Sequence, residues 1–134
     1  DLFLLDLWTG KASLDKLGAA GSYLMQAEGL SLLGGDALPL GILENVESGE
    51  KLMQLHQGDT LILLSDGVED AYENRQSMEE TIRDALTLET AQDAANAILT
   101  GAQSGDTAPA DDQTVLVLRL ILARVDAKIE EMYQ

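Results

Sequence analysis

The stretch Gly58-Asp59-Thr60-Leu61-Ile62-Leu63-Leu64-Ser65-Asp66-Gly67 decides the fold class. Its centre, residues 60–64, is apolar without alternation, which indicates a strand that is buried on both faces. The strand ends at Ser65, so the carboxylate of Asp66 is expected at its C-terminal end, where a sheet meets solvent. The sequence therefore predicts a central strand that carries an acidic group at its end.

Strands are predicted on the N-terminal side of this stretch. Residues 2–7 and 12–17 flank a short polar connection that contains Gly10, as in an antiparallel hairpin. Further short strands fit residues 22–26, 30–33 and 51–55. The segment 38–43 interrupts the pattern because Pro39 cannot donate a hydrogen bond to a neighbouring strand.

Helices are predicted on the C-terminal side. Ser77 and Glu80 have the spacing of a capping box, which places a helix start at Ser77, and a second helix is expected from Thr90 to near Gly101. Residues 114–120 then form another apolar strand. Strands, two helices and a returning strand indicate an α+β fold with helices packed on an outer face of a sheet or sandwich.

Composition narrows the function classes. The 134 residues fit one domain, and a net charge of -16 disfavours binding to nucleic acid or to anionic lipid. The absence of cysteine and the single histidine, His56, exclude thiolate chemistry and multi-histidine metal sites. No apolar run approaches the roughly 20 residues of a membrane span, and no signal peptide is visible. We expect a cytoplasmic location, either alone or as the cytosolic domain of a membrane-anchored parent.

Asp66 and Asp111 are the main candidates for chemistry. Asp111 and Asp112 open the last predicted strand, and if that strand pairs antiparallel with residues 60–64, Asp66 and Asp111 meet at one rim of the sheet. Two close carboxylates repel each other unless a proton or a cation lies between them, and Mg²⁺ and Mn²⁺ prefer such oxygen ligands. The pattern favours a metal-assisted hydrolase, with three further candidate metal ligands: Gly67, Asp70 and Asp112.

Structural interpretations of the same residues stay open. An Asp-Gly pair after a strand is typical of turns, and Asp111-Asp112 also fits a solvated strand start. The acidic cluster after Gly67 fits either outer-shell ligands or the solvated start of a helix: Glu69, Asp70 and Glu73. Catalysis by Ser22 or Ser65 is not favoured, because the chain has no G-x-S-x-G elbow and a serine triad needs a base that a third group orients. We interpret His56 as a half-exposed structural residue.

Four segments resemble, in order, motifs of the PP2C-type metal-dependent serine/threonine protein phosphatases. Residues 58–70 resemble the late metal-binding motif of that family, and residues 111–118 resemble its last motif. Residues 16–20 and 38–42 look like the branch of stage II sporulation protein E and the stress-response phosphatases. The resemblance identifies residues 1–120 as the C-terminal part of a phosphatase domain. Helical spacing of the apolar residues beyond it predicts that residues 121–134 are a strand end followed by an amphipathic helix.

The resemblance implies a fold and a reaction. The fold would be part of a four-layer αββα sandwich with antiparallel sheets, helices packed outside and two Mn²⁺ or Mg²⁺ ions at one end. Asp66 and Asp111 would be metal ligands, and a bridging water would attack the phosphorus of phosphoserine, commonly on an anti-anti-sigma-factor-like protein. The family's first metal motif, an upstream Asp-Gly pair, is not found, so this chain alone is expected to be inactive.

Two further hypotheses follow, one from the motif that is missing and one from the residues beyond the resemblance. The missing first motif fits a catalytically silent phosphatase fold that binds a regulatory partner. Apolar residues at helical spacing near the C-terminus suggest a helix that forms a homodimer: Leu122, Val125, Ile129 and Met132. Contact with nucleic acid or with a membrane is not expected from this segment.

Overall fold

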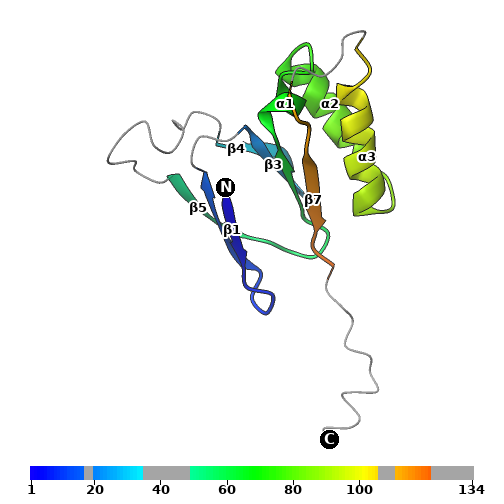
Figure 1. The fold of residues 1–134 in the computed structure, drawn as a ribbon. Coiled ribbons are helices and arrows are strands. Elements are labelled where there is room, and N and C mark those ends of the chain that lie inside the picture. Colours follow the sequence, from blue (N-terminus) through cyan, green and yellow to red (C-terminus); the bar gives the residue numbers. More distant parts are fainter. Residues whose placement is uncertain (17–19, 35–48, 106–110, 122–134) are drawn as a thin grey trace, which may run out of the picture.

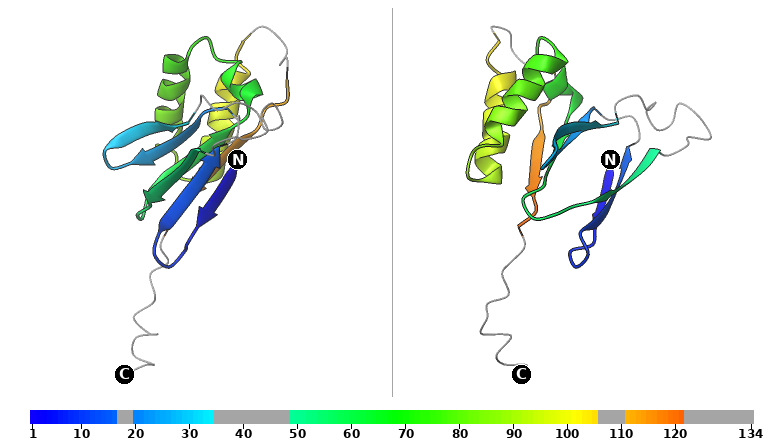
Figure 2. Two further views of the ribbon diagram at one scale, coloured as in Figure 1. Left: turned by 90° about the vertical axis from the view of Figure 1, so that its left-hand side faces the viewer. Right: turned by 180° about the vertical axis from the view of Figure 1, so that it is seen from behind.

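Two antiparallel sheets and a layer of helices make up the fold (Figures 1 and 2). The computed structural model describes residues 1–16, 20–34, 49–105 and 111–121. The first sheet has the strand order β1-β2-β5 and the second β4-β3-β6-β7. The strands are β1 (Leu2–Leu5), β2 (Lys11–Lys16), β3 (Ser22–Gln26), β4 (Gly29–Leu33), β5 (Gly49–Gln54), β6 (Thr60–Leu64) and β7 (Val115–Arg119).

Three helices complete the described chain: α1 (Asp66–Glu69), α2 (Arg75–Ala85) and α3 (Ala91–Ala102). The helices α2 and α3 cover the outer face of the four-stranded sheet, and α1 lies at one end of that sheet (Figure 1). The expected α+β class with antiparallel sheets and helices outside is confirmed. A second outer helical layer, on the three-stranded sheet, is not among the described residues.

The strand β6 is the centre of the fold, as its sequence predicts. Ile62 and Leu64 pack under the helices, together with buried side chains such as Tyr23, while Leu61 faces the other sheet. Leu61 and Ile62 are at most 1% exposed. Full burial of each such side chain stabilises the fold by about 1.5–3 kcal/mol, so the apolar run commits β6 to the interior.

The first hairpin turns earlier than predicted. The strand β1 ends at Leu5 rather than at residue 7, because Asp6 bonds to the backbone of the turn. Its Oδ1 accepts hydrogen bonds from the amides of Trp8 (2.8 Å) and Thr9 (3.3 Å), and its carbonyl accepts one from Gly10 (2.8 Å). Such side-chain bonds compete with strand pairing, so the turn begins at Asp6.

The helix α2 begins before the predicted capping box. Its N-cap is Asn74, whose side chain accepts a hydrogen bond from the Ser77 amide (2.9 Å), and Ser77 Oγ donates to the Asn74 carbonyl (2.9 Å). The prediction of Ser77 as the cap was wrong, because Asn caps at least as well as Ser and lies one turn earlier. The start of α3 is confirmed, since Thr90 Oγ1 accepts from the Asp93 amide at 3.0 Å.

Arg119, the last residue of β7, joins that strand to the helical layer. Its Nη1 donates to the carbonyls of Glu89 (2.8 Å) and Leu88 (3.2 Å), and its Nη2 donates to the carbonyl of Leu86 (3.2 Å). These carbonyls belong to the C-cap of α2 and to the connection that follows it. A guanidinium suits this place, because helix C-termini leave carbonyls without partners and carry partial negative charge.

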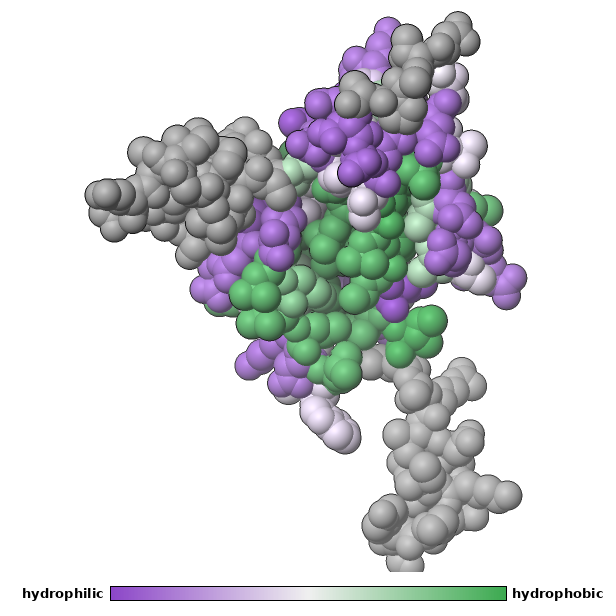
Figure 3. Space-filling view, viewed as in Figure 1, coloured by the Kyte–Doolittle hydropathy of each residue, from purple (hydrophilic) through white to green (hydrophobic). Residues whose placement is uncertain are grey.

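Apolar side chains also reach the surface. Figure 3 shows a broad apolar area on the face that carries the edge strands β1 and β7. Exposed members of these strands are Leu2, Leu4 and Leu116. No helix among the described residues is long and apolar enough to cross a lipid bilayer.

Several predictions fall outside the described residues. They concern the segment 38–43, most of the motif at 16–20 and the C-terminal amphipathic helix from residue 122, together with the homodimer suggested for it.

Candidate metal centre

The ends of β6 and β7 form the rim that carries the predicted metal ligands. The two strands pair antiparallel, with Leu64 opposite Val115, so the residues after β6 lie beside the residues before β7. The neighbourhood on which the metal hypothesis depended is therefore present. Asp66, Asp111 and Asp112 are all exposed at this end of the sandwich.

Ser65 fastens the two segments to each other. Its amide donates to the Thr114 carbonyl (3.0 Å), and its Oγ accepts from the Thr114 amide (2.9 Å). The same Oγ donates to the Asp112 carbonyl at 3.1 Å. This hydroxyl thus holds the backbone that carries Asp111 and Asp112 just before β7. The role was not predicted from the sequence.

Gly67 allows α1 to approach the start of β7 closely. A Cβ atom on Gly67 would lie 2.4 Å from the Asp112 carbonyl oxygen, which is closer than real side chains come. The Gly67 carbonyl accepts a hydrogen bond from Gln113 Nε2 at 3.1 Å. Gly67 therefore has a demonstrable packing role, while its role as a metal ligand stays a prediction, as do those of Asp70 and Asp112.

Gln113 is a second residue that the sequence analysis missed. It lies between Asp112 and Thr114, and its side chain crosses to α1. Its Oε1 is buried and has no hydrogen-bond partner among the described residues. Its position within the last motif could have indicated a structural role. However, a glutamine between two acidic residues and an apolar strand has the sequence context of an ordinary solvated residue.

The carboxylates keep oxygen atoms available. Asp66 Oδ1 accepts from the Gly67 amide (2.9 Å), and Asp111 Oδ1 accepts from the Asp112 amide (2.7 Å). Among the described residues these are the side-chain hydrogen bonds of both groups. Each carboxylate is thus oriented by its own backbone with one oxygen left over, and such hard oxygen donors suit Mn²⁺ or Mg²⁺.

The donor set suits these ions only in part. Among the described residues there is no cluster of three or more His, Cys, Asp or Glu side chains arranged to hold a metal. Mg²⁺ demands near-ideal octahedral coordination, and it commonly keeps several waters while protein carboxylates supply one or two ligands. Asp66 and Asp111 could supply these one or two carboxylate ligands, but they do not form a complete metal centre by themselves.

A buried lysine lies at the same end, between the two sheets. Lys16 is 4% exposed, and its Nζ donates to Asp1 Oδ2 (2.6 Å) and to Ser22 Oγ (2.8 Å). Burial lowers the pKa of Lys16, and the negative charge of Glu69 acts in the opposite direction. Ser22 is therefore a hydrogen-bond partner of the buried ammonium.

His56 lies at the other end of β6. Its side chain is 71% exposed, and its Nδ1 is 3.5 Å from Asp59 Oδ2, in a polar pocket that also includes Gln26 and Gln54. Because residues 65 and 66 follow β6 while His56 precedes it, this histidine cannot serve as a base for Ser65 or act at the acidic rim.

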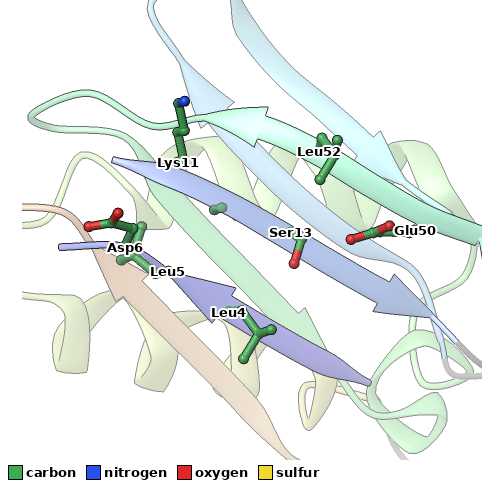
Figure 4. A pocket seen from close by; sticks show the side chains of 8 residues that line it. Leu4, Leu5, Asp6, Lys11, Ser13, Glu50 and Leu52 are labelled. Atoms are coloured by element: carbon green, nitrogen blue, oxygen red, sulfur yellow. The ribbon is translucent and has the colours of Figure 1, made fainter. Parts of the chain in front are cut away.

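Another pocket lies on the outer face of the three-stranded sheet, over β1, β2 and β5 (Figure 4). Its walls include Leu4, Ser13, Glu50 and Leu52. None of the predicted metal ligands lines it. The pocket is therefore separate from the acidic rim.

Comparisons with known proteins identify the family of this chain. The family "Stage II sporulation protein E (SpoIIE)" matches residues 1–121. No curated protein matches the chain.

Solved structures of phosphatase domains share the fold. The Mn-presoaked phosphatase domain of the cell fate determinant SpoIIE from Bacillus subtilis superposes with a TM-score of 0.71 at 24% identity, over 90% of this chain and 56% of that one. A longer structure contains the PP2C phosphatase domain and a fragment of the regulatory domain of that protein. It superposes with a TM-score of 0.73 at 25% identity, over 87% of this chain and 36% of that one. The catalytic domain of the serine/threonine phosphatase PstP, in complex with two manganese ions, superposes with a TM-score of 0.71 at 21% identity, over 90% of this chain and 57% of that one.

The chain spans little more than half the length of the phosphatase domains in the first of these structures. Within that span it has the PP2C phosphatase fold, with antiparallel sheets and outer helices. The matching family covers all but the last 13 residues. The chain therefore belongs to the SpoIIE family of PP2C-type phosphatases.

Proposed function

We propose that this chain supplies one side of a divalent-metal centre in a protein serine/threonine phosphatase. The observation that carries the proposal is the pair of carboxylates, Asp66 and Asp111, at the paired ends of β6 and β7. When bound, Mn²⁺ or Mg²⁺ supplies a Lewis acid and lowers the pKa of a coordinated water. The Mn-presoaked structure of SpoIIE and the structure of PstP in complex with two manganese ions support this choice of ion.

The residues of the chain hold and orient the donor atoms. Asp66 and Asp111 each present a carboxylate oxygen, Ser65 fixes the start of β7, and Gln113 with Gly67 keeps α1 against that start. The remaining ligands of a two-ion centre come, in this proposal, from outside these 134 residues. The chain alone then binds metal weakly and does not turn over substrate.

The proposed substrate is a protein that carries phosphoserine, of the anti-anti-sigma-factor type, in the cytoplasm. Membership of the SpoIIE family supports this class. The net charge of -16 supports a metal-dependent route to an anionic phosphate, because divalent cations offset the repulsion between the acidic protein and the phosphate.

The test is Mn²⁺-dependent phosphate release from a phosphoserine protein by the full-length protein and its Asp66→Asn variant. We expect Asp66→Asn to lower the rate on the order of a hundredfold, since one metal ligand loses its charge. Asp84→Asn is the matched control, because Asp84 is exposed on α2, away from the rim. Equal rates for both variants and the wild type would refute the assignment of Asp66.

A second comparison separates the phosphatase from a silent binding module. The 134-residue chain is assayed beside a chain extended upstream by about a hundred residues, the scale of a half-domain. Activity only in the extended chain supports a centre completed from outside this segment. No activity in either chain, nor in the full-length protein, favours a fold that binds a partner without turnover.

A further inference from the structure

Glu69, the last residue of α1, has a partner from a distant part of the chain. Its Oε2 accepts a hydrogen bond from the Gly21 amide at 3.2 Å, across 48 positions of sequence. Gly21 is buried and immediately precedes β3. This contact was not predicted from the sequence, and the outer-ligand role of Glu69 stays a prediction.

The segment that Glu69 holds is fastened from its other side as well. Gly21 faces the helical layer, where a Cβ atom would come within 2.9 Å of Leu32 and 3.6 Å of the Glu69 carboxylate. The next residue, Ser22, faces the space between the sheets and accepts a hydrogen bond from Lys16 Nζ at 2.8 Å. Gly21 and Ser22 thus link a buried cation of one sheet to the helix beyond the other.

The two ends of this link interact electrostatically. Lys16 occupies an inward position of β2, in line with Ala12 and Leu14, where a charge is costly to bury. The negative charge of Glu69 opposes the fall in the pKa of Lys16 that burial causes. Asp1 is the direct ion partner of Lys16 at 2.6 Å.

The helix α1 depends on such contacts for its direction. It has four residues, one helical turn, and so short a helix is not stable by itself. Its first residue is Asp66, Gly67 rests on the start of β7, Val68 is fully buried, and Glu69 bonds to Gly21. The carboxyl end of α1 is therefore held by Glu69, and the amino end carries the candidate ligand.

We propose that Glu69 is a positioning residue for Asp66. By holding the end of α1 against Gly21, it fixes the orientation in which Asp66 presents its carboxylate at the rim. This role rests on the proposed metal centre, and it assigns to Glu69 no contact with metal or substrate.

The test is direct Mn²⁺ binding by the metal-free full-length protein, followed by the electron paramagnetic resonance signal of free Mn²⁺. We expect Glu69→Ala to weaken Mn²⁺ binding about tenfold, which is the lower end of the loss when a group that orients a ligand is removed. Glu69→Gln keeps an oxygen that can accept from Gly21 and is expected to restore affinity to near the wild-type value. Glu28→Ala removes an exposed carboxylate in the β3–β4 turn and is expected to change nothing.

The melting temperature of each metal-free variant separates positioning from stability. A Glu69→Ala variant that melts earlier but binds Mn²⁺ as the wild type does, well below its melting temperature, would overturn the proposal. If Glu69→Ala does not fold, Glu69→Asp replaces it, because a side chain shorter by one methylene withdraws the carboxylate from Gly21. Unchanged Mn²⁺ binding by Glu69→Asp would then overturn it.

The Asp66→Asn variant distinguishes the positioning role of Glu69 from the metal centre itself. If Asp66→Asn weakens binding and Glu69→Ala does not, the positioning role is wrong and the metal centre stands. If neither variant changes Mn²⁺ binding, Asp66 is not a ligand and the proposed centre itself is wrong.

Discussion

The Gly67→Ala substitution tests the close approach of α1 to the start of β7. Its Cβ would meet three backbone atoms, the Asp112 carbonyl oxygen at 2.4 Å and the carbonyl carbons of Asp112 and Asp111 at 3.1 and 3.2 Å. Backbone atoms cannot rotate away as a side chain does. The start of β7 must therefore retreat by about 1 Å before the contact becomes an ordinary one.

The size of the effect follows from what that retreat breaks. It stretches the hydrogen bonds from Ser65 Oγ to the Asp112 carbonyl and from Gln113 Nε2 to the Gly67 carbonyl, both 3.1 Å long. Each bond contributes about 1 kcal/mol, and overpacking itself costs about 1–3 kcal/mol. Alanine in a helix gains at most about 1 kcal/mol over glycine. We expect a net loss of about 2–4 kcal/mol in the free energy of unfolding.

Urea unfolding measures this loss, with Gly105→Ala as the matched control. A Cβ on Gly105 would meet nothing within 4 Å, so that variant is expected to stay within about 0.5 kcal/mol of the wild type. Mn²⁺ binding by the full-length Gly67→Ala protein should weaken as well, since Asp66 and Asp111 are moved apart. A Gly67→Ala chain as stable as Gly105→Ala would refute the close approach.

Two further substitutions test other parts of the fold. Burial, followed by the charge of Glu79, raises the pKa of Tyr23 to about 12, so the folded state keeps the phenol protonated while the unfolded chain ionises near its ordinary value of 10.0. The contribution of Tyr23 to the free energy of unfolding should therefore be fully present below pH 10 and fall between pH 10 and about 12. The Tyr23→Phe variant, which also removes a buried hydroxyl without a described partner, should lose less stability over that window in urea unfolding. An equal loss in both proteins would contradict the burial of the phenol. Asn74→Ala should cost about 1 kcal/mol in the same assay as the loss of an N-cap, and Ser77→Ala should cost less; the reverse order would restore Ser77 as the cap.

The rim was predictable because its parts are local. The apolar run of β6 and the acidic residues beside Gly67 and before β7 are each visible in a few residues of sequence. Antiparallel pairing of the two strands then suffices to bring Asp66 and Asp111 to one end of the sheet. The metal role of both residues remains a prediction that only metal binding or activity can test.

The residues that hold the rim were not predictable, because their partners are distant or of an unexpected kind. The bond of Glu69 to Gly21 spans 48 positions, and no local pattern distinguishes it from a solvated acid. Lys16 was expected at the end of a strand, but a lysine on the inward face contradicts the usual pattern of apolar residues inside. The cap of α2 was missed for a simpler reason, since two capping residues, Asn74 and Ser77, stand three positions apart.

Arg119 gives the strand β7 a check on its alignment. Because side chains alternate across a strand, sliding β7 by one residue along β6 would turn Arg119 into the apolar space between the sheets and carry Leu118 beneath the helices. Three carbonyls of the helical layer would then lose their donor, and a guanidinium would lie among leucines. Arg119, at the end of β7, thus makes the misaligned pairing unfavourable. The correct alignment that results also fixes the position of Asp111, which precedes the other end of the strand.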